Sequence, residues 1–185
     1  MHIKKIFWAM RAVLFKITFK KIGWMSYIGP PLILDGVSRV ELGNKVRIYP
    51  GLRLETIGED SSIIIEDNVA IGQNFHIISK GKLIIKKNTT ISGNVFITNI
   101  DHDYKEIDKH ILEQPYLVKD TIIGENCFIG YGVAIQAGTI LGKQCIVGAN
   151  SVVRGEFPDY CVIVGAPARI VKKYNPQTKL WERVQ

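Results

Sequence analysis

The chain has 185 residues, of which 46% are hydrophobic and 22% charged, and a formal net charge of +7 at pH 7. This length predicts one domain with a single core. The positive residues are concentrated near the two ends and are not interleaved with stacking aromatic residues, which disfavours a nucleic-acid-binding protein and leaves an anionic cofactor or an anionic membrane surface as partners.

The N-terminal segment, residues 1–27, alternates basic with large apolar residues and contains no acidic residue. On a helix, one apolar face would consist of Ile6, Met10, Val13, Leu14 and Ile17, bordered by Lys5, Arg11, Lys16 and Lys20. Its uncharged runs are shorter than the ~20 residues that cross a bilayer. Two roles stay open for this basic amphipathic helix: it lies on an anionic membrane surface, or it packs on the following domain and covers an exposed edge.

A period of six residues dominates the rest of the chain. Within residues 121–154 an aliphatic residue occupies every sixth position, at Ile123, Ile129, Ile135, Leu141, Val147 and Val153. The same period occurs earlier, at Leu42, Ile48, Leu54, Ile65, Ile71, Ile77, Ile85, Ile91 and Ile97. Three such hexads make one triangular coil with its aliphatic side chains inside, whereas an amphipathic helix requires spacings of three and four. The sequence therefore predicts an all-β protein, a parallel β-helix over residues 28–174.

Bends and interruptions complete this pattern. Asparagines that favour a left-handed backbone are expected at equivalent bends, at Asn44, Asn68, Asn88 and Asn126. The hexads stop once, over residues 98–120, where charges, two histidines and a proline indicate an extruded loop that carries function or contacts a neighbour. For the C-terminal tail, residues 175–185, a short helix is predicted.

The three cysteines, Cys127, Cys145 and Cys161, have neither a CxxC motif nor metal-ligand spacing. Cys127 and Cys145 lie one coil apart at the same inward position, which predicts two stacked core thiols; a disulfide between them is geometrically conceivable. The N-terminus lacks the pattern of a cleavable signal peptide, which favours free thiols in a reducing cytosol.

The hexads, the extruded loop with a histidine and the closing sequence VIVGAPARIVKK together resemble the hexapeptide-repeat O-acetyltransferases. The resemblance covers roughly residues 40–174 and is greatest for the branch with maltose, galactoside and bacterial surface-polysaccharide acetyltransferases. It implies a left-handed coil, a homotrimer with each active site between two subunits, and transfer of an acetyl group from acetyl-CoA to a hydroxyl. No metal is expected.

The resemblance also implies roles for individual residues. His102, in ITNIDHDY, matches the catalytic histidine, and a neutral imidazole suits removal of a proton from a hydroxyl. Asn74, in IGQNFHI, matches an asparagine that contacts the acceptor sugar, although an asparagine that serves only the bend is the alternative. His76, two residues later, is expected in the same groove as a substrate contact.

The cofactor would lie along the last coils. Phe128 takes the place of an aromatic residue beside the pantetheine arm, and Tyr131 stands where a backbone amide points to the thioester oxygen, with the direction of its side chain left open. The basic residues near the phosphates would be Arg169, Lys172 and Lys173, with a solvated basic tail as the alternative. The remaining positions assigned to the cofactor are Gly130, Gly148, Ala149 and Arg154.

The sequence thus predicts an acetyl-CoA-dependent O-acetyltransferase that acts on a sugar in bacterial surface-polysaccharide biosynthesis. We expect a cytoplasmic protein, with peripheral contact to the inner face of the membrane through residues 1–27. A sugar N-acetyltransferase, a free-sugar acetyltransferase and, in another class, a non-catalytic β-helix binding protein are the alternatives. A γ-type carbonic anhydrase is disfavoured because the spacing of its three histidine zinc ligands is absent.

Overall fold

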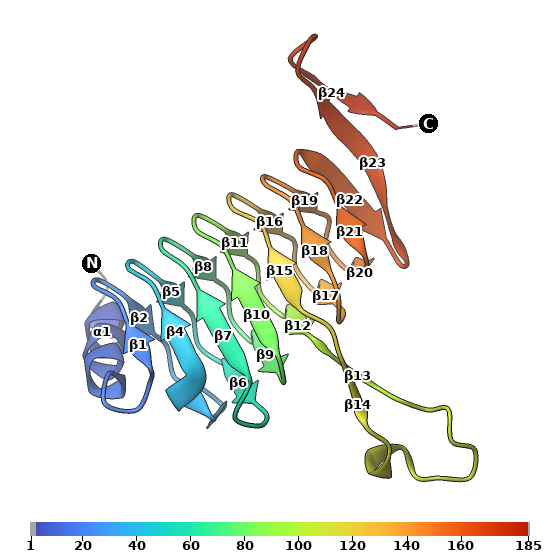
Figure 1. The fold of residues 1–185 in the computed structure, drawn as a ribbon. Helices are drawn as coiled ribbons and strands as arrows, with labels where there is room; N and C mark the ends of the chain where they lie inside the picture. Colours follow the sequence, from blue (N-terminus) through green and yellow to red (C-terminus); the bar gives the residue numbers. More distant parts are fainter. Residues whose placement is uncertain (1–2, 185) are drawn as a thin grey trace.

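Three parallel sheets form the sides of a triangular column, in a computed structural model that describes residues 3–184 (Figure 1). Sheet A contains β1 (Lys21–Ile22), β4 (Val40–Leu42), β7 (Ser62–Ile65), β10 (Lys82–Ile85), β15 (Thr121–Ile123), β18 (Ile140–Leu141) and β21 (Glu156–Phe157). Sheet B begins with β2 (Tyr27–Ile28), β5 (Arg47–Ile48), β8 (Ala70–Ile71), β11 (Thr90–Ile91), β16 (Phe128–Ile129), β19 (Ile146–Val147) and β22 (Cys161–Gly165). Sheet C contains β3 (Ile33–Asp35), β6 (Arg53–Thr56), β9 (His76–Ser79), β12 (Phe96–Thr98), β17 (Ala134–Ile135) and β20 (Val152–Val153).

The core of the column consists of the predicted aliphatic ladders. In sheet A, Leu42, Ile65 and Ile85 lie in register on successive strands, and each is fully buried. All the other predicted hexad positions are buried as well. Because each such side chain contributes about 1.5–3 kcal/mol on burial, these ladders hold the coils together. Cys127, Cys145 and Cys161 are buried free thiols in the same core, with 3.5 Å between the sulfurs of Cys145 and Cys161.

The bends between sheets A and B confirm most of the predicted asparagines. Asn68, Asn88 and Asn126 all have positive φ angles, near 60°. Asn44 is an error by one position, because Lys45 has the left-handed backbone there, with φ 56°. The side chain of Asn44 instead accepts a hydrogen bond from the backbone of Trp24 on the preceding coil, at 2.8 Å.

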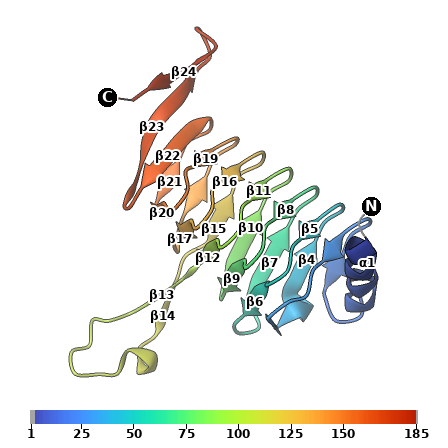
Figure 2. The ribbon, with the colours of Figure 1, turned by 180° about the vertical axis from the view of Figure 1, so that it is seen from behind.

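The N-terminal helix α1 (Ile3–Phe15) lies across the end of the column (Figure 2). Ala12 is buried against the first coil, and the Trp8 ring packs against Tyr27 and Tyr49 at 5.9 and 5.6 Å between centroids. The helix therefore covers the end of the core, as one of the two predicted roles requires. The first coil begins already at Lys21, in β1. A short 3-10 helix, η1 (Val37–Arg39), precedes β4.

The predicted extruded loop is an antiparallel hairpin that projects from the column after β12 (Figure 1). It consists of β13 (Ile100–His102), a turn with the 3-10 helix η2 (Ile111–Glu113), and β14 (Tyr116–Val118). Asn99, which is fully buried, fixes the exit point: its side chain donates to Ser79 and accepts from the backbone of Lys80.

The predicted C-terminal helix is wrong. Residues from Ala168 onward form β23 (Ala168–Asn175), which pairs antiparallel with β22, and β24 (Leu180–Arg183), which pairs with β23. The last strand of sheet B leaves its backbone groups open, and a returning strand satisfies them where an isolated short helix would not. Within residues 3–184, no helix is long and apolar enough to cross a bilayer.

Candidate active site

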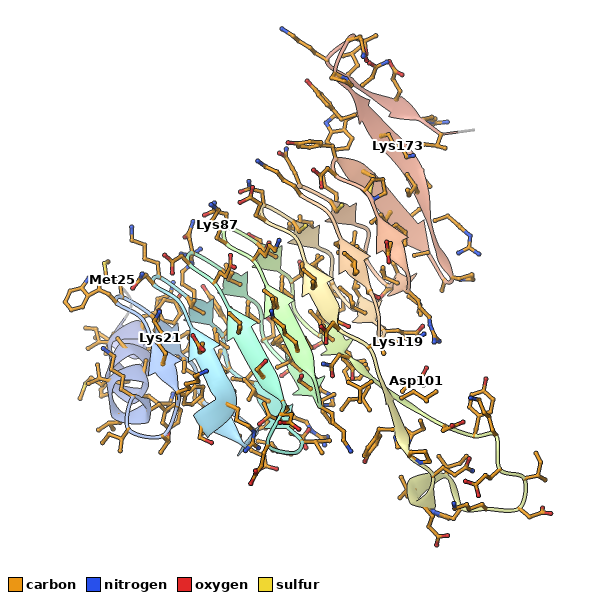
Figure 3. All side chains as sticks on the ribbon, viewed as in Figure 1. Lys21, Met25, Lys87, Asp101, Lys119 and Lys173 are labelled. Atoms are coloured by element: carbon orange, nitrogen blue, oxygen red, sulfur yellow. The ribbon has the colours of Figure 1, made fainter. Side chains whose placement is uncertain are left out.

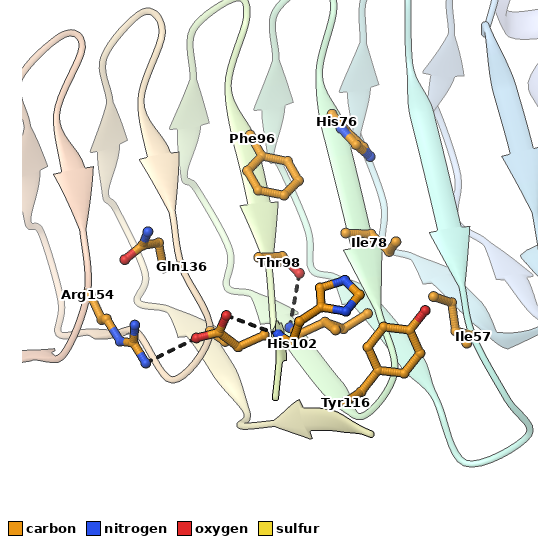
Figure 4. A pocket seen from close by; sticks show the side chains of 12 residues that line it. Ile57, His76, Ile78, Phe96, Thr98, His102, Tyr116, Gln136 and Arg154 are labelled. Atoms are coloured by element: carbon orange, nitrogen blue, oxygen red, sulfur yellow. Dashed lines mark hydrogen bonds and ion pairs between the residues drawn. The ribbon is translucent and has the colours of Figure 1, made fainter. Parts of the chain in front are cut away.

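A cavity of about 380 Å³ opens between sheet C and the base of the hairpin (Figure 4). It is lined by Ile57, His76, Ile78, Phe96, Thr98, Ile100, Asp101, His102, Tyr116, Gln136, Ala137 and Arg154. The lining therefore combines apolar and aromatic side chains with two imidazoles, an ion pair, a hydroxyl and an amide. This combination is typical of a binding site for a small polar molecule.

His102 ends β13 and faces this cavity. Its register partner across the hairpin is Tyr116, and the two rings lie 4.9 Å apart at an angle of 57°. Among residues 3–184, no donor or acceptor pairs with the buried Nδ1 of His102. A neutral imidazole has one nitrogen that donates and one that accepts, and no residue of this part of the chain uses either capacity at Nδ1.

An ion pair ties the hairpin to the column. Arg154, just after β20, places Nη2 3.2 Å from Oδ2 of Asp101, the neighbour of His102. On the other side, the Lys80 ammonium lies 4.4 Å from the centroid of the Tyr116 ring. Figure 3 shows Asp101 where the hairpin leaves the column. These contacts hold both strands of the hairpin, and thereby the imidazole, against sheet C.

His76, on β9, lies in the same cavity. Its ring packs on Phe96 at 4.8 Å, and Nε2 is 3.4 Å from a carboxylate oxygen of Glu55, too poorly aligned for a hydrogen bond. Burial, followed by the positive charge of Arg53, lowers the pKa of His76, and Glu55 only partly opposes the shift. The side chain is therefore a neutral imidazole near pH 7.

Asn74 lies outside the cavity, at the bend between sheets B and C. Its φ of 55° is left-handed, and its side chain donates to Asn94 at 3.0 Å. Asn94 in turn donates to the hydroxyl of Tyr131. The bend interpretation of Asn74 thus accounts for its conformation, and the open question about Tyr131 is answered: its side chain lies along the same edge and extends this ladder.

The residues assigned to the cofactor gather mainly on sheet B and on its edge with sheet C. Phe128 points outward from β16, and Tyr131 and Ala149 occupy equivalent bends on successive coils. Gly130 is buried, and a Cβ there would lie 2.7 Å from the backbone nitrogen of Ala149, so coil stacking alone requires a glycine. Gly148 is also close-packed, since its Cβ would meet Val164 at 2.8 Å.

The basic residues divide between two places. Arg169, Lys172 and Lys173 are exposed on β23, with Arg169 opposite Val164 at the edge that carries Ala149. Arg154 lies apart from them, in the cavity of His102. Figure 3 places Lys173 on the strand at the far end of the column from α1.

His102 and the cofactor residues occupy opposite edges of sheet C within one chain. Tyr131 precedes β17 (Ala134–Ile135), and Gln136, which lines the cavity with His102, follows it. At about 3.4 Å per residue of extended chain, the five steps between them span at most about 17 Å. Within one chain, the residues predicted for the base and for the cofactor therefore lie apart.

Several residues of the cavity were not predicted. Tyr116 and Asp101 fall within the predicted loop of residues 98–120, and Phe96 and Gln136 are direct neighbours of the hexad positions Ile97 and Ile135. Their position in the sequence could have indicated them, because each of these residues lies next to the interruption of the repeat or one coil from it. Within residues 3–184, no three His, Cys, Asp or Glu side chains cluster in a way that could hold a metal ion.

Comparison with known proteins identifies the family. Residues 120–155 match the model of the bacterial transferase hexapeptide (six repeats). The chain is 36% identical over 162 residues to the putative lipopolysaccharide biosynthesis O-acetyl transferase WbbJ of Escherichia coli (strain K12), an alignment that covers 83% of this chain and 81% of that protein.

Solved structures share the fold. AntD, an N-acyltransferase from Bacillus cereus in complex with dTDP and 3-hydroxybutyryl-CoA, superposes with a TM-score of 0.72 at 19% identity, over 91% of this chain and 90% of AntD. Galactoside acetyltransferase in complex with coenzyme A superposes with a TM-score of 0.60 at 21% identity, over 100% and 81% of the two chains. The column is thus the left-handed parallel β-helix that the resemblance implied, and the chain belongs to the hexapeptide-repeat transferases, as an acetyltransferase of that family.

Proposed function

We propose that this acetyltransferase transfers the acetyl group of acetyl-CoA to a hydroxyl of a sugar, with His102 as the general base. The observation that carries the proposal is the position of His102, at the base of the hairpin and in the wall of the cavity, with an Nδ1 that is unpaired among residues 3–184. Two relatives support the same chemistry by their names: WbbJ is named an O-acetyl transferase, and the structural neighbour is named a galactoside acetyltransferase.

The imidazole would take the proton from the sugar hydroxyl as its oxygen attacks the thioester carbonyl. A new C–O bond forms and the C–S bond breaks. The imidazolium then returns the proton to the departing thiolate, so coenzyme A leaves as a thiol. The backbone N–H of Tyr131 forms no hydrogen bond within residues 3–184, which makes it available for the oxyanion of the tetrahedral intermediate.

The protein would act as a homotrimer. His102 and the edge that carries Tyr131 and Ala149 are separated by the width of sheet C, so a neighbouring subunit must bring the second half-site to the first. The flat, exposed sides of a triangular column suit such packing. Apolar side chains on the hairpin, among them Ile107 and Leu112, are exposed in the single chain and would contact the neighbour.

The acceptor would lie between Phe96 and Tyr116, because aromatic faces pack well against the apolar face of a sugar ring. His76 would donate or accept one hydrogen bond as a neutral imidazole. Asn74, on the edge between sheets B and C, would contact the acceptor in the site of a neighbouring subunit. We place the enzyme in the cytoplasm, in the biosynthesis of a bacterial surface polysaccharide, with the N-terminal helix at the inner face of the membrane.

Replacement of His102 by Ala tests this function. Turnover should fall by about 10²–10⁴-fold, because the alcohol loses its base, while acetyl-CoA binds with unchanged affinity. His110→Asn is the matched control: His110 belongs to the same hairpin, outside the cavity, and Asn can still accept the bond from Leu112 that caps η2. Wild-type turnover in His102→Ala, or an equal loss in both variants, would refute the assignment.

A sugar N-acetyltransferase is the second candidate, favoured by the structural similarity to the N-acyltransferase AntD. The two functions differ in the acceptor atom. Paired acceptors that carry a hydroxyl or an amine at the same ring position separate them, and we expect the hydroxyl compound to have the higher kcat/KM.

A further inference from the structure

The helix α1 has two apolar faces, of which the column uses one. Each residue advances about 100° around a helix, so Trp8, Ala12 and Phe15 share one side and Ile6, Met10 and Leu14 the opposite side. The first side packs on the column, and Arg11 donates from its guanidinium to the backbone oxygen of Ile28 at 3.1 Å. This fixes the helix, and its second apolar side points away from the core.

The outward side forms a large exposed apolar surface. Leu14 is 68% exposed and Ile17 88%, and the neighbouring turn adds Trp24 at 73%. The other exposed members are Ile3, Ile6, Phe7, Met10, Val13 and Met25. Figure 3 shows Met25 at this end of the column. A contiguous surface of this kind is typical of a docking site.

The charges around this surface have one sign. Residues 1–34 contain Lys4, Lys5, Arg11, Lys16, Lys20 and Lys21 and no acidic residue. Lys20 is paired with Glu41 at 2.9 Å, and within residues 3–184 no carboxylate lies in ion-pair range of the other five cations. A second copy of the same surface would repel this one, whereas an anionic lipid surface attracts it.

Two adjoining cavities lie where the helix meets the first coils. An apolar one of about 190 Å³ is lined by Ala12, Val13, Ile22 and Trp24, among others. The second, of about 400 Å³, contains Lys5, Lys45 and Arg47 together with Tyr27. The two share Ala9, Met25 and Ser26, so an apolar slot leads directly to a cationic one.

We propose that this end of the column docks on an anionic bilayer, with the outward side of α1 and Trp24 in the lipid and a lipid phosphate held by Lys5, Lys45 and Arg47. The helix would lie in the interface, in the manner of a basic amphipathic helix, and not span it. Apolar slot and cationic cavity together match one amphiphile, a phospholipid with an acyl chain and an anionic head.

Docking in this way sets the height of the active site above the membrane. The hairpin leaves the column at β12, three strand spacings from β3, which is on the order of 15 Å. This consequence rests on the proposed function: the acceptor would be a sugar attached to a membrane lipid, reached without leaving the bilayer surface.

Co-sedimentation of the full-length protein with vesicles tests the docking without any turnover. We expect binding to phosphatidylcholine vesicles that contain phosphatidylglycerol, little binding to phosphatidylcholine alone, and a blue shift of tryptophan emission that the Trp24→Phe variant lacks. Lys5→Gln with Lys45→Gln should weaken partitioning by about 30-fold, since each cation near an anionic membrane surface strengthens binding by about fivefold. Phe7→Asp with Leu14→Asp should abolish it.

The control variants make the same kinds of substitution elsewhere in the chain. Lys82→Gln with Lys86→Gln, on sheet A midway along the column, and Leu180→Asp, on β24, should bind as wild type does. Every altered position is exposed or lines a surface cavity, so we expect each variant to fold. Thermal unfolding checks this. Absence of binding by the wild-type protein, equal binding to both vesicle types, or equal losses in variants and controls would overturn the proposal, whatever the enzyme activity. A change of oligomeric state in Phe7→Asp with Leu14→Asp, without loss of vesicle binding, would also overturn it, because the surface would then be an interface between copies.

Discussion

His76 faces the same cavity as His102. His76 is half-buried beside Arg53, and its folded-state pKa is lowered, mainly by burial. Because the imidazole is neutral, His76 suits a hydrogen bond to the acceptor more than an ion pair. The lowered pKa of His76 makes the free energy of unfolding depend on pH, which can be measured apart from catalysis.

Stability should fall at acid pH because of His76. In the unfolded chain its pKa is about 6.5, whereas the folded-state pKa is lower, so the unfolded state binds the proton first as pH falls. The contribution of His76 is complete above about pH 6.5 and is lost progressively below it. Urea unfolding at about pH 7.5 and about pH 5.5 should show a larger loss for wild type than for His76→Gln. Equal losses would contradict the lowered pKa.

Arg154 has two alternative roles that an experiment can distinguish: contact with acetyl-CoA, or an ion pair that holds the hairpin. In the predicted role it contacts acetyl-CoA, but the structure pairs it with Asp101 beside His102. We expect Arg154→Ala to lower kcat/KM for the acceptor by about tenfold, through a looser hairpin, and to leave the affinity for acetyl-CoA unchanged. Stability should change little, because an exposed ion pair contributes about 0–1 kcal/mol. A rise in the Kd for acetyl-CoA, measured by calorimetry, would instead support the cofactor role; Arg169→Ala is the comparison.

At the scale of the element, the ladders can be tested by position. Ile135 is fully buried between Ile97 and Val153 in sheet C, and Ile135→Ala should cost about 2–5 kcal/mol of unfolding free energy. Ile140, one hexad further on, points outward from sheet A and is 37% exposed. Ile140→Ala should cost about 1 kcal/mol or less. Chemical denaturation at one fixed protein concentration makes the comparison, and similar losses at both positions would contradict the inward ladder.

The sequence predicts elements well where one local period decides them. A six-residue repeat with aliphatic residues inside admits only one face for Ile123, Ile129 or Ile135, and the structure places all three in the core. Prediction from the sequence fails where a pairing strand elsewhere in the chain decides the secondary structure. Residues 168–175 become a strand because β22 offers an open edge, and residues 180–183 then pair with that strand. No local pattern in the segment reveals these partners.

The site shows the same division. The location of His102 in the loop that interrupts the repeat is predictable from its motif, and the structure places it at the base of a projecting hairpin. Its neighbour Tyr116 depends on the register of β13 with β14, fourteen residues apart in sequence, and Arg154 reaches Asp101 across two coils. These contacts follow from stacking, so they appear only once the column is assembled.

At the scale of the whole molecule, the residues proposed for the base and for the cofactor lie at two separate edges of one chain. His102 lies at the edge between sheets C and A, and Tyr131 and Ala149 lie at the edge between sheets B and C. The proposed sharing of the active site between subunits would explain why the proposed site residues lie at both edges. An active site within one chain would require acetyl-CoA to cross the outer face of sheet C.

Mixing two inactive variants distinguishes these arrangements. His102→Ala lacks the base, and Ala149→Trp, at an exposed bend, blocks the cofactor edge without filling the core. If each site combines His102 of one subunit with the cofactor edge of its neighbour, random co-assembly restores about a quarter of the sites. If both halves come from one chain, every site stays defective. We therefore expect activity to return when the variants are unfolded and refolded together, and to remain absent when they are refolded separately and then mixed. No recovery on joint refolding, with mixed oligomers verified by differently tagged chains, would exclude the shared site.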